Sequence, residues 1–176
     1  MNIRKIDSQD ESDIHKFMII RKESILNDQK YHNLMTYIDE EKDFSIEGYK
    51  KYDFLKNYFI IENENNFIAY GGYIQTWSRN FQWNHNFTIW PIYVSPEFRR
   101  KKLGQKILSA IETEILQNFS YKNINLLLLV NAENSSAIGL YKKCGFEEMW
   151  IYKNYIQTRE WKNFDVKIMQ KNITHQ

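Results

Sequence analysis

Cysteine, proline and glycine are scarce in this chain, and long apolar runs are missing. The 176 residues include a single cysteine, Cys144, so neither an intrachain disulfide nor a cysteine-based metal site can form. Two prolines and six glycines leave no room for a low-complexity linker. No stretch approaches the roughly 20 consecutive apolar residues of a membrane span, and the first residues lead into polar sequence instead of an apolar signal core. We therefore expect a cytoplasmic protein with no membrane partner.

The sequence also has few histidines and a small net charge. The four histidines, at positions 15, 32, 85 and 175, lie far apart and form no ligand spacing, so we expect no metal. The net charge is +2, which divides into −3 for residues 1–88 and +5 for residues 89–176. This asymmetry fits either two differently charged ligands or ordinary surface solvation.

Apolar residues, by contrast, are plentiful enough for one packed core. They make up 43% of the sequence, and aromatic residues make up 16%. Because domains cluster near ~100–150 residues, the length predicts a single domain over residues 1–176.

Alternation and helical spacing predict strands and helices interspersed around one mixed sheet, an α/β or α+β fold. Asn2–Ile6 is expected to form a strand, and Ser8 or Asp10 to cap the helix after it. Two weaker helices are expected between Asp28 and Lys56. The later elements are a hairpin of Tyr58–Glu62 and Phe67–Trp77, a strand Phe87–Val94, a helix over 103–118, a strand Asn125–Val130 covered on both faces, a short helix capped by Asn134 or Ser135 and closed by Gly145, and strands Phe146–Tyr152 and Phe164–Met169.

Two strands contain residues that disturb a regular ladder. Gly71-Gly72 predicts a bulge or a close approach by another group. Pro91 cannot donate to a ladder and predicts a local break in its strand.

A basic segment joins a predicted strand directly to a predicted helix. Its sequence is Ile92-Tyr93-Val94-Ser95-Pro96-Glu97-Phe98-Arg99-Arg100-Lys101-Lys102-Leu103-Gly104-Gln105. The first turn of a helix presents unpaired N–H groups and the positive end of its dipole, which suit a pyrophosphate, and the four cations add to the attraction. Alone, the segment also fits a solvated patch or a nucleic-acid contact.

This segment resembles the acetyl-CoA-binding motif of the GNAT superfamily of N-acetyltransferases. In that family, V-x-P-x-x-R leads into an R/Q-x-x-G-x-G/A loop, and this chain matches at Val94, Pro96, Arg99 and Gly104. Lys102 stands where the family commonly has its first glycine. We expect the loop amides still to point inward if Lys102 keeps an ordinary φ.

A second segment, over residues 131–146, resembles the family's N-x-x-A-x-x-L-Y-x-K-x-G-F motif. The matching positions are Asn134, Ala137, Leu140, Tyr141, Lys143, Gly145 and Phe146. Together the two motifs cover about residues 90–147. The resemblance implies a mostly antiparallel sheet of six to seven strands flanked by about four helices, with a splayed strand pair that holds acetyl-CoA as co-substrate.

The resemblance also implies roles for individual residues. The expected cofactor-binding residues are Ile92, Tyr93, Val94, Arg99, Arg100, Lys101, Lys102, Leu103, Gly104, Gln105, Asn134, Tyr141 and Lys143. An amide near Val94 is expected to polarise the thioester carbonyl, and Tyr141 to protonate the departing CoA thiolate. A phenol with a pKa of ~10 and a thiol near ~8.5 are roughly matched for this transfer.

The general base is the point of departure from the family pattern. Residues 88–93 include no carboxylate, so no base is carried over from the resemblance. His85 has a suitable intrinsic pKa, although a lone loop histidine is more often simply solvated. A water relay, or an acceptor that arrives neutral, is equally compatible with the sequence.

The predicted reaction is transfer of an acetyl group to a primary amine, either a small cationic amine such as a polyamine or aminoglycoside, or a peptide amine. The expected lining of the acceptor site, each residue of which also fits a solvated face or ordinary core, is Asp39, Glu40, Glu41, Asp43, Glu47, Tyr73, Trp77, Trp83, Trp90 and Trp150. A non-catalytic acyl-CoA-binding regulator of the same fold is the main alternative. Nucleic-acid binding is disfavoured by the nearly neutral charge. Both a monomer and a homodimer remain open.

Overall fold

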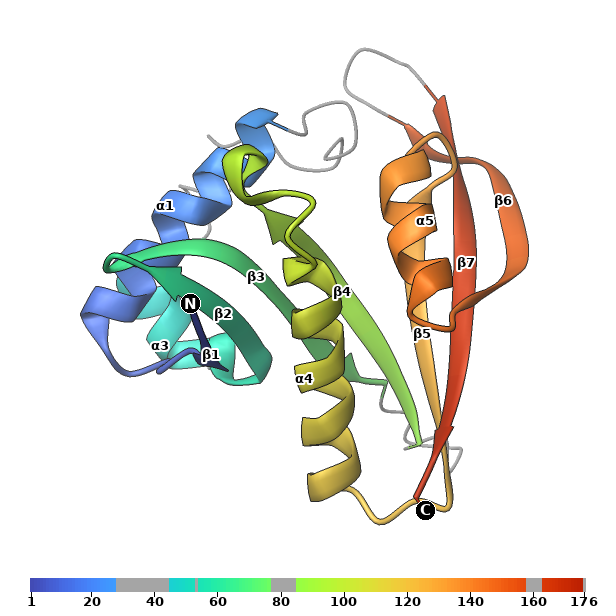
Figure 1. Cartoon of the computed structure of the whole chain (residues 1–176), viewed down its shortest axis with the longest axis horizontal. Coiled ribbons are helices and arrows are strands. Elements are labelled where there is room, and N and C mark those ends of the chain that lie inside the picture. Colours follow the sequence, from blue (N-terminus) through green and yellow to red (C-terminus); the bar gives the residue numbers. More distant parts are fainter. Residues whose placement is uncertain (28–44, 53, 77–84, 158–162, 176) are drawn as a thin grey trace. The chain divides into compact units, whose positions relative to one another are not determined.

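The structure, a computed structural model, describes residues 1–27, 45–52, 54–76, 85–157 and 163–175 (Figure 1). The strands are β1 (Asn2–Lys5), β2 (Tyr58–Asn63), β3 (Asn66–Gln75), β4 (Asn86–Val94), β5 (Asn123–Asn131), β6 (Glu147–Gln157) and β7 (Asn163–Thr174). The α-helices are α1 (Glu11–Asn27), α3 (Ile46–Tyr52), α4 (Leu103–Asn118) and α5 (Ser135–Lys143), and short 3₁₀ helices span Phe54–Asn57 and Pro96–Phe98.

The strands form one sheet in the order β1-β2-β3-β4-β5-β7-β6. Neighbours β4 and β5 are parallel, whereas β1/β2, β2/β3, β5/β7 and β6/β7 are antiparallel. The predicted mixed, mostly antiparallel sheet of six to seven strands with about four helices is therefore confirmed for the residues that the structure describes. In these residues no helix is both long and apolar enough to cross a membrane.

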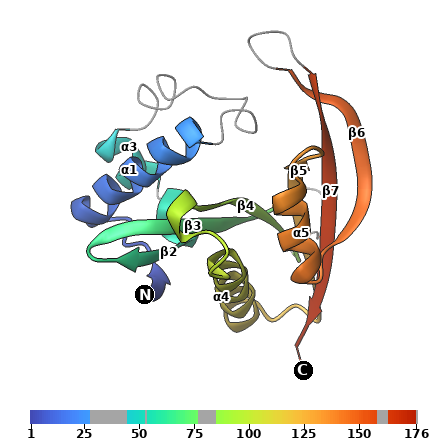
Figure 2. The ribbon, with the colours of Figure 1, turned by 45° about the horizontal axis from the view of Figure 1, so that its top comes forward.

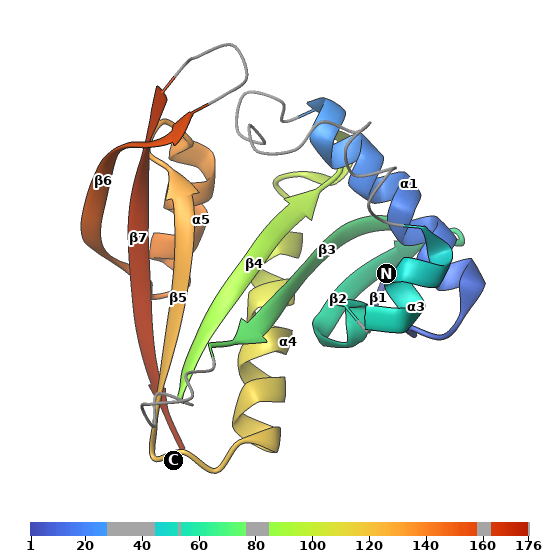
Figure 3. The same cartoon turned by 180° about the vertical axis from the view of Figure 1, so that it is seen from behind.

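The described chain divides into two compact units. The first comprises Met1–Gly72 and Pro91–Ile107, and the second comprises Tyr73–Trp90 and Leu108–Gln176. In the first unit, the buried side chains of α1 pack with those of α3, β2 and β3 in one apolar core, which includes Ile14, Phe17, Tyr49, Ile60 and Tyr70. Figure 3 shows α1 and α3 on the same side of β1 and β2. The Phe17 ring meets the rings of Tyr49, Tyr58 and Tyr70 edge-on, and the Tyr70 and Tyr93 rings lie in tilted contact.

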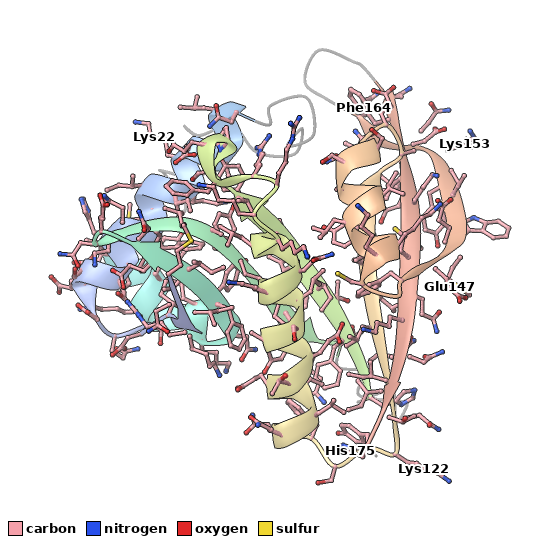
Figure 4. All side chains as sticks on the ribbon, in the orientation of Figure 1. Lys22, Lys122, Glu147, Lys153, Phe164 and His175 are labelled. Atoms are coloured by element: carbon pink, nitrogen blue, oxygen red, sulfur yellow. The ribbon has the colours of Figure 1, made fainter. Side chains whose placement is uncertain are left out.

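In the second unit, α5 covers one face of β5 and β7, and β6 forms the outer edge beyond β7 (Figures 1 and 2). An ion pair between Lys171 of β7 and Glu112 of α4, with an N–O distance of 2.7 Å, joins those two elements. Figure 4 marks Glu147 and Lys153 along β6, and it marks Lys122 and His175 near the C-terminal end of β7.

The start of the chain follows the sequence prediction closely. β1 ends one residue before the predicted Ile6, and α1 begins after Asp10, whose Oδ1 accepts a hydrogen bond from the amide of Ser12 at 2.9 Å. Asp10 is thus one of the two predicted caps. The weak helix predicted at the start of the 28–56 region lies outside the described residues, and the second predicted helix corresponds to α3 and the 3₁₀ turn after it.

The β2–β3 hairpin turns where Asn63-Glu64-Asn65-Asn66 predicted it. Glu64 and Asn65 have φ values of 48° and 65°, the pair of left-handed residues that a two-residue hairpin loop requires. Asparagine tolerates this region better than most residues, which explains why this sequence turns here.

Close approach by other groups accounts for Gly71-Gly72. The irregularity of the β2–β3 register lies between Ile61 and Glu62. A Cβ atom at Gly71 would come within 2.7 Å of Ile107 Cγ2 and 2.9 Å of Ile92 Cγ1. Gly71 therefore allows α4 and β4 to pack directly on the backbone of β3.

The β4–β5 pairing and the burial of β5 bear on two predictions. The parallel register covers Asn86–Thr88 and Asn125–Leu127, and so ends before Pro91, as the predicted break requires.

The prediction that β5 is covered on both faces is wrong. Ile124, Leu126 and Leu128 are buried, whereas Leu129 is 48% exposed, because α4 and α5 supply apolar partners to one face of the strand.

Candidate active site

The end of β4 is fixed to its neighbours by backbone and side-chain hydrogen bonds. The amide of the buried Ser95 donates to the carbonyl of Ile68 at 2.9 Å, and Arg99 Nε donates to the carbonyl of Val94 at 3.0 Å. Pro96 begins the 3₁₀ turn that follows, where its missing N–H costs nothing. Val94 and Arg99, both predicted site residues, are therefore held together.

The basic loop adopts an unusual backbone. Arg100 and Lys102 have φ values of 63° and 59°, in the left-handed region, which costs a residue with a Cβ atom about 1–2 kcal/mol. The expectation that Lys102 keeps an ordinary φ is thus wrong, because the loop retains the conformation that glycine favours even with lysine in place. Alternation of left-handed with ordinary residues turns successive N–H groups toward one point and creates an anion-binding concavity.

α4 begins immediately after this loop. Its first bond to the preceding loop runs from the amide of Lys106 to the carbonyl of Lys102, at 3.1 Å. By helix geometry the amides of Leu103, Gly104 and Gln105 have no intrahelical acceptor four residues back. Leu103 and Gly104 are buried and Gln105 is half-buried, whereas the side chains of residues 99–102 are exposed. Anchoring apolar residues and exposed cations thus surround a positive helix end.

Ile92 and Tyr93, two other predicted site residues of β4, contact different elements. Ile92 packs beside Gly71, as described above. The buried Tyr93 donates from its hydroxyl to Glu23 Oε1 at 2.8 Å and accepts from Asn27 Nδ2 at 3.1 Å, and its ring lies 5.8 Å from the guanidinium carbon of Arg99. Glu23 was missed by sequence reasoning, since nothing in a helical pattern indicates a contact with a strand 70 residues later.

The second motif forms α5 and its ends. Asn134 Oδ1 accepts from the amide of Ala137 at 3.1 Å, which confirms it as the N-cap. Gly145 has a φ of 87° and closes the helix, as predicted. Lys143 is exposed, and Ile138 and Tyr141 supply the buried face. The cap explains Asn134 through helix structure, whereas its expected cofactor contact stays a prediction.

Tyr141 is buried at 8% exposure, and its ring contacts Phe146 edge-on at a centroid distance of 6.0 Å. Burial of the neutral phenol, with the thiolate form of Cys144 as a smaller cause, raises the pKa of Tyr141 to about 12. The phenol is therefore a weaker acid than a thiol of pKa ~8.5, and the near match expected from sequence is wrong. Tyr141 can still donate a hydrogen bond to a developing thiolate at any physiological pH.

His85 lies in the turn before β4 and is half-buried. Its carbonyl accepts from the amide of Asn125 at 2.9 Å, which fixes its backbone at the start of the β4–β5 pairing. His85, Asn134, Tyr141 and Lys143 belong to the second unit, and residues 92–105 belong to the first. The predicted site residues are therefore divided between the two units.

The other predicted site residues lie in different surroundings. In the parts of the chain with described structure, no group of three or more His, Cys, Asp and Glu side chains is placed to hold a metal ion. Trp90 and Trp150 are exposed, at 47% and 65%, and their place in an acceptor site stays a prediction. Tyr73 is instead buried at 3%, because it packs against Phe87. Glu47 is exposed, and the other predicted acceptor-site residues lie outside the described residues.

Comparisons with known proteins agree on one family. A profile of the acetyltransferase (GNAT) family matches residues 23–146. The ribosomal protein bS18-alanine N-acetyltransferases of Salmonella typhimurium and Escherichia coli K12 are 36% and 34% identical over 73 residues, which make up 42% of this chain and 47% of each relative. The chain thus matches about half the length of these curated relatives.

Solved structures share the fold over nearly the whole chain. The ribosomal-protein-alanine N-acetyltransferase of Brucella melitensis has a TM-score of 0.73 at 20% identity, over 98% of this chain and 100% of that one. A GNAT superfamily phosphinothricin acetyltransferase of Sinorhizobium meliloti, solved in complex with acetyl-CoA, has a TM-score of 0.72 at 18% identity, over 98% of this chain and 88% of that one. At this level of identity the likeness establishes the fold.

Proposed function

Because this chain belongs to the acetyltransferase (GNAT) family, we propose that it transfers the acetyl group of acetyl-CoA to a primary amine, by direct attack of the amine on the thioester. The observation that carries the proposal is the loop of residues 99–102 with its two left-handed residues, directly before the N-terminus of α4. Strained backbone of this kind persists where the surrounding structure requires it, commonly at ligand sites.

The donor groups of this segment fit the anionic end of acetyl-CoA. Inward amides and a helix N-terminus suit a pyrophosphate, and the exposed cations of residues 99–102 suit further phosphate charge. We assign the pyrophosphate to the amides of residues 100–105. The assignment extends to Ile92, Tyr93 and Val94 as contacts of the pantetheine arm, with Asn134, Tyr141 and Lys143 as contacts from the second motif.

In the proposed reaction, the amine nitrogen attacks the thioester carbon and the negative charge develops on the carbonyl oxygen. The Val94 amide would donate a hydrogen bond to that oxygen, a contribution that grows in the transition state. The C–S bond then breaks with its electron pair on sulfur. The Tyr141 hydroxyl would donate a hydrogen bond to this thiolate, and His85 remains a candidate for proton acceptance.

The acceptor that we favour is a peptide N-terminal amine. Support comes from the relatives named as acetylating an alanine of ribosomal protein bS18. A peptide α-amine has a pKa of about 7.7–8.0, so a useful fraction is neutral near pH 7.5 without assistance. A small cationic amine, such as a polyamine or aminoglycoside, is the second candidate.

The test measures acetyl-CoA binding by calorimetry and CoA thiol release with three acceptors. These are a short peptide that starts with alanine, the same peptide with its N-terminus already blocked, and a polyamine and aminoglycoside mixture. We expect release with the free peptide and none with the blocked one. Release only with the mixture would replace the peptide by a small amine. Tight binding without release would favour a regulatory protein, and absence of binding would refute the proposed function.

A further inference from the structure

The structure brings one carboxylate to the end of β4, although residues 88–93 of that strand carry none. Glu23, on α1, accepts the hydrogen bond of Tyr93, and Tyr93 directly precedes Val94. Asn27, one turn further along α1, donates to the same hydroxyl. The three side chains thus connect the C-terminal part of α1 with the segment assigned to the thioester.

Only one of the two oxygen atoms of the Glu23 carboxylate takes part in these contacts. Glu23 is half-buried, and its Oε1 atom accepts the Tyr93 hydroxyl. Among the residues that the structure describes, no side chain or amide donates to its Oε2 atom. A carboxylate held on one oxygen and open on the other has the geometry of a positioned proton acceptor.

The neighbours of this group are polar and fixed in place. The Tyr70 hydroxyl, on β3, contacts Ser24 Oγ at 2.8 Å and accepts from Arg21 at 3.0 Å. The Tyr70 and Tyr93 rings lie 5.8 Å apart, and the guanidinium of Arg99 lies over the Tyr93 ring. Tyr93 thus contacts Glu23, Tyr70 and Arg99, and Arg21 of α1 contacts Tyr70.

We propose that Glu23 is the general base of the reaction, with Tyr93 and Asn27 as positioning residues. This inference rests on the proposed acetyl transfer. The acceptor arrives as an ammonium group and gives one proton to Glu23, and the electron pair of the broken N–H bond stays on nitrogen. That electron pair then forms the C–N bond. The C–S bond breaks, and its electron pair leaves with sulfur. Glu23 passes its proton to water. The second proton that nitrogen loses, after attack, balances the proton taken up by the CoA sulfur.

The test compares Glu23→Gln with Glu11→Gln across pH 6.5 to 9.5, using the alanine-starting peptide as acceptor. Glu11 is an exposed carboxylate of the same helix, and its hydrogen bond to Lys50 lies away from Tyr93. We expect Glu23→Gln to lower kcat/KM about 100-fold near pH 7, within the usual range for a lost general base. The deficit should shrink as the pH passes the α-amine pKa of about 8, because the amine then arrives neutral. Glu11→Gln should follow the wild type.

Acetyl-CoA affinity separates this role from a structural one. Glu23→Gln should bind acetyl-CoA within twofold of the wild type, and Tyr93→Phe should show a smaller kcat deficit with the wild-type pH profile. A deficit in Glu23→Gln that is constant with pH, or that accompanies weak acetyl-CoA binding, would assign Glu23 a structural role and overturn the inference. Turnover by the wild type, whatever the variants do, leaves the proposed function standing. No wild-type turnover of any amine would remove the basis of both.

Discussion

Single residues in left-handed backbone set the shape of the basic loop. Lys102 stands where the family commonly carries glycine, and it nevertheless has a φ of 59°. Lysine adds a cation at the position where phosphate is expected, while its Cβ atom strains the backbone. Function and stability therefore place opposite demands on this residue.

Replacement by glycine separates these two effects. We expect Lys102→Gly to leave the melting temperature unchanged or raise it by ~2–4 °C, because relief of about 1 kcal/mol of strain offsets the greater freedom of glycine when unfolded. The matched control is Lys101→Gly, which removes the same charge at a position without positive φ and should lower the melting temperature. Thermal unfolding of both variants measures the difference. Equal losses in the two would show that Lys102 is not strained.

Burial makes Tyr141 a neutral donor over a wide pH range. Because the folded pKa is raised to about 12, above the unfolded value near 10, the stability contributed by the neutral phenol is complete below pH 10 and is lost between about pH 10 and 12. The same shift means that the acetylation rate should show no titration of Tyr141 below pH 10.

We therefore expect Tyr141→Phe to lower kcat by a similar factor, on the order of 10-fold to 100-fold, at every pH from 7 to 10. Initial rates of thiol release at saturating acetyl-CoA measure it. A wild-type rate that falls with a midpoint near pH 9, and a Tyr141→Phe rate that does not, would contradict the raised pKa.

At the scale of elements, two glycines show that packing decides whether a Cβ atom at that position would stabilise or destabilise the protein. Gly71 lies under Ile107 of α4 and Ile92 of β4, whereas Gly139, in the middle of α5, has nothing within 4 Å of an added Cβ atom. The sequence predicted a special role for Gly71 from its place in a strand. Only the packing shows that the neighbours are apolar side chains from two other elements.

The same substitution at these positions should act in opposite directions. Gly71→Ala should destabilise the protein by about 1–3 kcal/mol through overpacking against branched side chains. Gly139→Ala should stabilise it by up to about 1 kcal/mol, because alanine is the better helix former. Denaturant unfolding of the two variants gives both numbers. Loss of stability in Gly139→Ala would mean that another group packs against α5 at this position.

At the scale of the whole molecule, ion pairs in both units favour the folded state at neutral pH. Asp13, buried in the first unit, accepts two hydrogen bonds from Arg4 and one from the amide of Asp7, and these partners hold the pKa of its carboxyl below the ordinary value. In the second unit, Lys142 and Lys167 lower the pKa of Glu148 to about 2. A lowered folded pKa contributes stability that is present above the unfolded value, near 4, and is lost as the pH falls through the folded value.

Acid should therefore weaken the protein progressively from about pH 5 to pH 2. Asp13→Asn should cost about 1–3 kcal/mol at pH 7, since it removes the carboxylate that pairs with Arg4. The difference in unfolding free energy from wild type should narrow toward pH 2. Urea unfolding at a series of pH values measures the free energy. A difference that stays constant with pH would show that the carboxylate charge is not the stabilising feature.

Local patterns in the sequence determined much of this molecule. The turn at Glu64-Asn65, the span of α4, the cap at Asn134 and the close of α5 at Gly145 each depend on a few adjacent residues, whose backbone preferences and hydrogen bonds are intrinsic to them. The two cofactor motifs are likewise continuous in the chain, so the family was already evident from them.

Tertiary structure decided the features that depend on distant neighbours. The one-sided burial of β5, the raised pKa of Tyr141 and the contact between Glu23 and Tyr93 all arise from packing between elements far apart in the sequence. Periodicity reports which face of an element is apolar, but not which element covers that face. For this reason the sequence could predict a cofactor site from its two motifs, and the fold alone brought the Glu23 carboxylate to the end of β4.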